Sequence, residues 1–247
     1  MLPVRHLSKA PITEALVDIR IAGARPEDQA LETLAASLKN IYPHVEPRKQ
    51  FQATFRSQGG RMVTNAKDKG LQGFFLHSQD RTKVVQIRVD GFTFNKLKPY
   101  TTAEELIDEA LGVWEQYREA VSPPVVARVA LRYLNRLDLP FQPGDDFSRF
   151  LTSAPPVADT QGQSVREFLS RVVCNYEEAE ALAVVTQRLA PEPKTRTTPV
   201  TLDIDVFREG QFGTSVSDLR PMLEILRTLK NRIFFSLVTP EAMELFE

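Results

Sequence analysis

The chain has 247 residues, of which 42% are hydrophobic and 26% are charged, and its formal net charge is −1. This length and apolar content allow one large domain or two small ones around a sizeable core. The single cysteine, Cys174, excludes a disulfide within one chain and a cysteine-rich zinc site. Because no apolar run is long enough to span a membrane and the N-terminus lacks a secretory signal, we expect a cytoplasmic protein without membrane association.

The first half of the chain, residues 1–121, predicts a strand, a helix, three strands and a second helix. The strands are expected at residues 14–21, 50–56, 73–77 and 84–98, and a polar loop at 57–70. Asp90-Gly91 is a turn or bulge signal inside the last of these strands. The first helix is expected at 27–42, and the second begins at Thr102, with Glu105 completing a capping box.

The second half, residues 122–247, predicts a similar order of elements. A strand at 125–139 precedes a short helical patch near 146–151, and three further strands are expected at 165–176, 181–189 and 200–207. Residues 190–199 are expected to form an exposed hairpin loop, and Gly210–Gly213 a turn between strand and helix. A long helix capped by Ser217 or Asp218 and a short one after Thr239 close the chain.

Runs of antiparallel strands with helices at the edges indicate an α+β fold. We expect two similar strand–helix–three-strand–helix halves that form one compact unit, with an extended antiparallel sheet covered by long helices. No residue-level repeat accompanies this order, so the internal duplication is inferred from topology alone.

Several segments together resemble a known group of proteins. They are residues 10–15, 84–100, the helix with Trp114 and Tyr117, and residues 131–140, 202–207 and 231–246. On these segments the chain is identified as a member of the sporadically distributed, uncharacterised protein family of bacteria and archaea. The resemblance implies a cytoplasmic prokaryotic protein. Because that family has no established activity or catalytic residues, it supplies no functional residue.

Charge is distributed unevenly along the chain. Residues 48–98 contain eleven basic and three acidic residues, a net charge of +8, so the remainder carries −9. Six phenylalanines are interleaved with these cations, a composition that can bind single-stranded nucleic acid. The alternative is that the phenylalanines fill the core and the cations face the acidic helix at 102–119, which also permits a homo-oligomer. The near-neutral total charge favours this alternative over nucleic acid.

The best candidates for a binding surface are polar side chains on two strands. Arg132, Asn135 and Arg136 lie on the strand at 125–139, and Arg88 and Lys96 are expected to contribute to the same neighbourhood. Arginine can grip phosphate or carboxylate through two hydrogen bonds, and it can equally form cross-strand ion pairs.

Two aspartates form the other candidate site. Asp203 and Asp205 alternate on a strand and therefore point to the same face. With a third ligand such as Glu177 or Asp138 they can hold a divalent metal ion. They can equally be the solvated face of an amphipathic strand or pair with arginines, and this second reading is favoured.

The sequence therefore favours a non-enzymatic binding module that engages an unidentified protein or polyanion through an Arg/Lys-bearing sheet face. The alternative is a metal-dependent enzyme that acts on phosphate esters or nucleic acid through Asp203 and Asp205. No cofactor is expected, since the glycines match neither a P-loop nor a dinucleotide fingerprint.

Overall fold

In the part of the chain that the structure describes, one antiparallel sheet of nine strands forms the centre of the protein, in the order β2-β3-β4-β5-β1-β6-β9-β8-β7. The structure is a computed structural model and describes residues 7–58, 61–141, 146–153, 165, 167–189 and 198–247, with the side chains of 51–69 and Thr198 left out. The strands are β1 (Ile12–Ala22), β2 (His44–Gln58), β3 (Arg61–His77), β4 (Lys83–Arg88), β5 (Gly91–Leu97), β6 (Val125–Leu139), β7 (Phe168–Tyr176), β8 (Ala181–Leu189) and β9 (Thr198–Phe212). The predicted α+β class and extended antiparallel sheet are confirmed.

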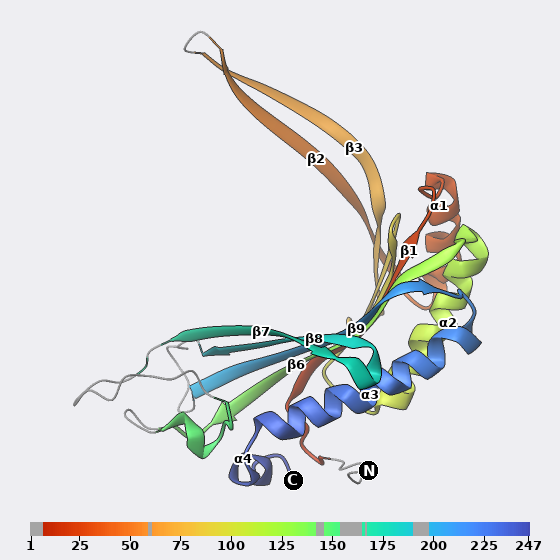
Figure 1. Ribbon diagram of the computed structural model, residues 1–247. Coiled ribbons are helices and arrows are strands. Elements are labelled where there is room, and N and C mark those ends of the chain that lie inside the picture. Colours follow the sequence, from red (N-terminus) through yellow and green to blue (C-terminus); the bar gives the residue numbers. More distant parts are fainter. Residues whose placement is uncertain (1–6, 59–60, 142–145, 154–164, 166, 190–197) are drawn as a thin grey trace.

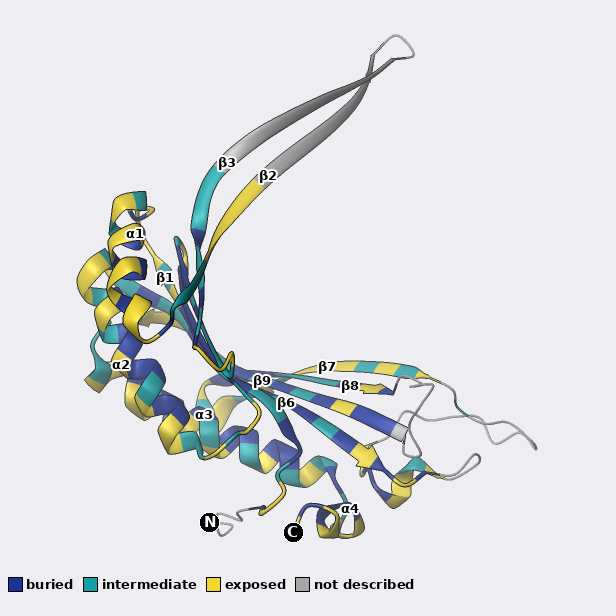
Figure 2. Cartoon of the chain, turned by 180° about the vertical axis from the view of Figure 1, so that it is seen from behind, coloured by how far each residue is buried: buried dark blue, intermediate teal, exposed yellow. Residues whose placement is uncertain are grey.

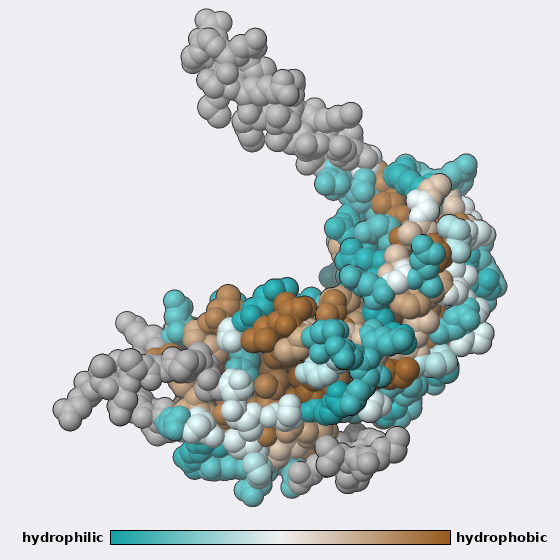
Figure 3. All heavy atoms as spheres, viewed as in Figure 1, coloured by the Kyte–Doolittle hydropathy of each residue, from teal (hydrophilic) through white to brown (hydrophobic). Residues whose placement is uncertain are grey.

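The sheet is strongly curved, and the helices lie on its convex side (Figure 1). They are α1 (Asp28–Ser37), α2 (Ala103–Val121), α3 (Val216–Leu237) and the short α4 (Pro240–Glu244), with 3₁₀ turns η1 (Leu38–Asn40), η2 (Phe147–Arg149) and η3 (Glu177–Ala179). The opposite, concave side faces a hollow and is called the open face below (Figures 1 and 3).

Strand alternation decides which side chains reach the core between sheet and helices. In β1, Ala15, Val17 and Ile19 are fully buried, and the register places Val17 beside Phe94 of β5 and Leu131 of β6. The intervening β1 residues point to the open face. Figure 2 shows the resulting buried layer where the central strands meet the helices. Burial of these apolar side chains is the main favourable contribution to folding.

The two long helices each present an apolar stripe to this core. In α2, Trp114 and Tyr117 are fully buried, as predicted, and Thr102 accepts a hydrogen bond from the backbone N–H of Glu105 at 3.1 Å. In α3 the capping residue is Ser215, two residues before the earlier of the two predicted candidates, and Asp218 completes a capping box. The helix begins earlier because Ser215 is followed at N3 by a carboxylate that reaches back to it.

The strand predicted at 84–98 is two strands. β4 and β5 form a hairpin in which Arg88 lies opposite Gly91, so Asp90-Gly91 marks a turn and the first half has four strands after α1. Gly91 has φ +144°, and a side chain there would bring Cβ to 2.2 Å from the Ile19 carbonyl oxygen. Only glycine fits this turn without displacing β1.

The predicted loop at 57–70 is also wrong. β2 and β3 pair from His44 with His77 to Gln58 with Arg61, and this long hairpin extends beyond the rest of the sheet (Figure 1). Its polar composition is typical of a loop, but the pairing of the two strands satisfies the backbone hydrogen bonds. In the second half, β9 runs on to Phe212 through most of the predicted glycine turn, and the helical patch is the 3₁₀ turn η2. The hairpin loop predicted at 190–199 falls largely outside the described residues.

Candidate functional site

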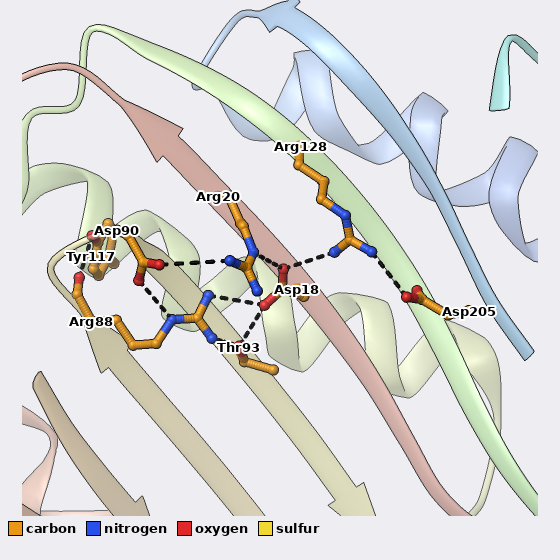
Figure 4. A network of polar contacts seen from close by, with 8 residues as sticks. All are labelled: Asp18, Arg20, Arg88, Asp90, Thr93, Tyr117, Arg128 and Asp205. Carbon is orange, nitrogen blue, oxygen red and sulfur yellow. Dashed lines mark hydrogen bonds and ion pairs between the residues drawn. The ribbon is translucent and has the colours of Figure 1, made fainter. Parts of the chain in front are cut away.

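Polar side chains from five neighbouring strands meet at the centre of the open face (Figure 4). They form what we call the charged network, which consists of Asp18, Arg20, Arg88, Asp90, Thr93, Arg128, Arg132, Asp203 and Asp205. The strands bring them together because β4, β5, β1, β6 and β9 are adjacent and each contributes outward-facing residues, while Asp90 lies in the turn between β4 and β5.

Asp18 is the centre of the network and only 6% exposed. Its Oδ2 accepts hydrogen bonds from Arg88 Nη2 at 2.9 Å and Thr93 Oγ1 at 2.8 Å, and its Oδ1 accepts one from Arg128 Nη1 at 3.0 Å. Arg20 Nε also donates to Oδ1, at 3.2 Å. Burial alone would raise the pKa of Asp18, but Arg88, Thr93 and Arg20 outweigh it and the pKa is lowered.

Arg88 is buried among acceptors. Besides Asp18, its guanidinium donates to Asp90 Oδ1 at 3.0 Å and to Thr93 Oγ1 at 2.5 Å, and 7% of the residue is exposed. Its carbonyl oxygen accepts a hydrogen bond from the hydroxyl of Tyr117 at 2.8 Å, so α2 holds this strand end from the helix side. A buried guanidinium with such partners is rigidly positioned.

Arg128 joins the two halves of the network. One amino group donates to Asp18 and the other to Asp205 Oδ2, at 3.0 Å, while the guanidinium carbon lies 4.2 Å from the ring centre of Phe207. Burial raises the pKa of Asp205, although Arg128 and Arg132 counteract it. Arg132 then binds Asp203 through two hydrogen bonds of 2.8 and 2.5 Å. The network thus contains four arginines and four aspartates and carries no net charge.

A cavity of about 500 Å³ opens over the network. Leu16, Gln86 and Glu209 line it together with seven network residues. Beyond it, β7 exposes apolar side chains: Leu169 is 71% and Val173 51% exposed. Val173 lies opposite Val184, which lies opposite Asp205, so Val173 shares the open face. Hydrophobic and hydrophilic surface lie side by side along the hollow (Figure 3).

The five residues predicted for one binding surface do not lie together. Arg88, Arg132 and Arg136 are on the open face, where Arg136 pairs with Asp138 at 3.0 Å. Lys96 lies on the helix side, and its amine donates to Glu105 at 3.1 Å and Glu109 at 3.2 Å of α2. Asn135 also lies on the helix side, where it donates to the carbonyl oxygen of Leu202 at 3.0 Å. The expectation that Lys96 shares a neighbourhood with Arg88 is therefore wrong.

Asp203 and Asp205 point to the same face, as predicted, but each is paired with an arginine. Of the proposed third ligands, Asp138 is paired with Arg136. Within the described ranges, no three His, Cys, Asp or Glu side chains are grouped as metal ligands. This part of the site is built as a set of ion pairs.

The cations of residues 48–98 are spread over different environments. Lys83 and Lys96 face α2 and pair with Glu109, at 2.5 and 3.2 Å, whereas Arg88 is buried in the charged network. Arg48 lies near the ring of Phe75, at 5.9 Å from its centre. The side chains of Arg56, Arg61, Lys67 and Lys69 lie outside the described residues. The described cations therefore do not form one continuous basic surface.

Sequence reasoning missed Asp18, Arg20, Thr93 and Arg128 as members of the site. The available signal was polar alternation in β1, where Asp18 and Arg20 interrupt an apolar strand at a spacing of two.

No protein-family model matches this chain, and no curated protein matches it. None of the described helices has the length and apolar character needed to cross a membrane.

Proposed function

We propose that the protein is a non-enzymatic binding module that receives a partner protein in the hollow of its curved sheet. The observation that carries this proposal is the open face itself, where a neutral arginine–aspartate network adjoins exposed Leu169 and Val173. Protein interfaces combine apolar contact with arginine and complementary polar groups, whereas a polyanion needs an excess of positive charge. The balanced network supports a protein partner over a polyanion.

The test is capture of partners from the native host with wild-type protein and with an open-face variant, Arg132→Gln/Arg136→Gln. A matched control, Arg220→Gln/Arg232→Gln, removes two exposed charges from α3 on the convex side. We expect wild type and control to capture the same partner protein, in an amount that nuclease treatment does not change. The open-face variant should capture at least tenfold less of it. Equal capture by both variants would refute the proposal.

A polyanion, including nucleic acid, is the second candidate partner, and the long hairpin β2–β3 is the observation that favours it. Residues 44–77 contain six basic and two acidic residues, a net charge of +4. A projecting two-stranded ribbon is a shape that the major groove of DNA admits.

The metal-dependent enzyme is not retained, because both of its aspartates are engaged by arginines.

We further infer that the halves 1–121 and 122–247 are related by internal duplication within one compact unit. The support is the pairing order, since β1-β5-β4-β3 on one side of the sheet matches β6-β9-β8-β7 on the other. In the chain, α2 follows β5 and α3 follows the equivalent strand β9.

Membership in the sporadically distributed family and a cytoplasmic, prokaryotic origin also remain proposals, supported by the segments named above.

A further inference from the structure

A second cavity, of about 250 Å³, lies on the helix side of the sheet, away from the charged network. It is lined by residues 7–11 before β1, the turn that leads into α2, strand β6 and helix α3. Its apolar walls include Ile12, Phe234 and Phe235, and its polar groups include Tyr100, Asn135 and Lys230. A small apolar cavity with a few polar groups is the usual form of a small-molecule site.

Lys230 is the unusual residue of this cavity. It is 8% exposed, and its amine lies 3.8 Å from the ring centre of Tyr133. Among the described residues, no carboxylate or hydrogen-bond acceptor contacts the amine. The aromatic ring offsets only part of the cost of burying an ammonium group. The described part of the chain thus places a buried amine against a cavity and supplies no anion for its protonated form.

The other charged groups at the cavity already have partners. Arg227, which precedes Lys230 by three residues on α3, binds Glu104 at 2.5 Å and Glu224 at 3.3 Å. The hydroxyl groups of Tyr100 and Tyr133 are 3.0 Å apart, so one hydroxyl hydrogen remains for a further acceptor. The Lys230 amine and one tyrosine hydroxyl are therefore donors that lack an acceptor among the described residues, which suits an incoming anion.

We propose that this cavity binds a small apolar molecule that carries a carboxylate, and that the carboxylate becomes the counter-ion of Lys230. The carboxylate accepts a hydrogen bond from the ammonium group, and the hydrocarbon part lies against Ile12 and Phe234. A charge-assisted hydrogen bond inside an apolar cavity is stronger than the same bond in water. This site is separate from the hollow that receives the partner protein.

The proposal predicts a specific dependence on pH. Burial, with a smaller contribution from Arg227, lowers the pKa of Lys230 to about 7. Burial raises the pKa of Tyr100 to about 12 and that of Tyr133 well above its usual value. A backbone hydrogen bond, with a smaller contribution from Arg227, lowers the pKa of Glu104. Burial lowers the pKa of Arg227, but its ion pairs with Glu104 and Glu224 outweigh burial, so the pKa is raised. Between pH 5.5 and 8.5 Lys230 is therefore the described group at the cavity that changes charge.

A carboxylate binds the protonated amine, so affinity is highest below pH 7 and falls as the amine loses its proton above pH 7. Above pH 7 the affinity falls by up to roughly tenfold per pH unit. Over the same range the number of protons taken up on binding rises from near zero to near one per ligand. Titration calorimetry of the full chain with benzoate and hexanoate measures both quantities when it is repeated in buffers of different ionisation enthalpy. Benzamide and hexanamide are the matched neutral probes and should bind at least tenfold more weakly at pH 6.

The variant Lys230→Met keeps the length and packing of the side chain and should lose both the carboxylate preference and the pH dependence. Lys39→Met, at an exposed lysine of η1, should behave as the wild type. Any of three results would overturn the proposal. The carboxylates do not bind at pH 6, they bind no better than the amides, or they bind Lys230→Met as well as the wild type. The wild-type pH profile decides the question even if Lys230→Met does not fold.

Discussion

Asp18 is the residue on which the charged network depends. It comes from the central strand β1, and three of the four residues that donate to its carboxylate are 70 to 110 positions away in the sequence. Arg88 is almost as buried as Asp18, so each compensates the charge of the other inside the protein. A buried charge that loses its partner is strongly destabilising, whereas an exposed ion pair contributes little.

We expect Asp18→Asn to lower the free energy of unfolding by about 3 kcal/mol at pH 7, because Arg88 and Arg128 lose a shared anion. Asp90→Asn is the matched control, since the Asp90 side chain is 56% exposed and also pairs with Arg88. The control should lose less than about 1 kcal/mol. Urea denaturation measures both variants, and equal losses would contradict a special role for Asp18.

The same variant has a defined pH dependence. The folded-state pKa of Asp18 lies below that of the unfolded chain, so its stabilisation is present above the unfolded pKa and is lost as pH falls through the folded pKa. The stability difference between wild type and Asp18→Asn should therefore shrink as the pH is lowered below about 4. A difference that grows with acidity would show that Asp18 is not stabilised as a carboxylate.

Helix α2 connects the core to the candidate site. Trp114 and Tyr117 are stacked with ring centres 5.4 Å apart, and both lie about 6 Å from the ring of Phe92 in β5. The indole N–H of Trp114 donates to the carbonyl oxygen of Thr214 at 2.9 Å, just before α3 begins. One helical turn therefore joins β5, the end of β4 and the start of α3.

Trp114→Ala should lower the free energy of unfolding by about 3–5 kcal/mol, since it leaves a large cavity and an unpaired carbonyl oxygen. Gly112→Ala, two residues earlier, is the control on the exposed side of the same helix, where an added Cβ meets no atom within 4 Å. It should raise stability by about 0.5–1 kcal/mol. Denaturant midpoints test both, and a loss below about 1 kcal/mol for Trp114→Ala would mean that the stripe is not packed.

At the scale of the whole molecule, the long hairpin is distinct from the rest of the sheet. β4 pairs with β3 only over Gly73–His77, and the carbonyl oxygens of Leu71 and Gln72 accept hydrogen bonds from Arg25 and Val89. In residues 51–69, the strand pairing is that of β2 with β3. The remainder of the sheet carries the core and the charged network. We therefore expect that the fold does not depend on the hairpin.

Replacing residues 51–69 with Asn-Gly should shorten the hairpin and leave the fold intact, because the removed backbone pairs only with itself. We expect a melting temperature within a few degrees of wild type. If the hairpin binds a polyanion, the shortened chain should also lose affinity for a labelled oligonucleotide and show a smaller salt dependence. A large drop in melting temperature would show that the hairpin stabilises the body of the protein.

Local sequence patterns determined most of the elements of this protein. Alternating apolar residues predicted β1, β6, β7, β8 and β9, and the stripe with Trp114 predicted α2, because one face of each must be buried in any compact fold. The sequence also placed Asp203 and Asp205 on one face of β9. These features depend on spacing along a single element and need no knowledge of its neighbours.

The tertiary structure decided the rest. Residues 84–98, taken as one continuous strand, put Arg88 and Lys96 on the same face. The turn between β4 and β5 shifts the alternation, so Ile87 and Phe92 lie side by side on the helix side. Arg88 therefore lies on the open face, whereas Lys96 lies on the helix side. Asp18 and Arg128 become partners only because β1 lies between β5 and β6. Strand order and the register across turns are properties of long-range pairing, which no local periodicity encodes.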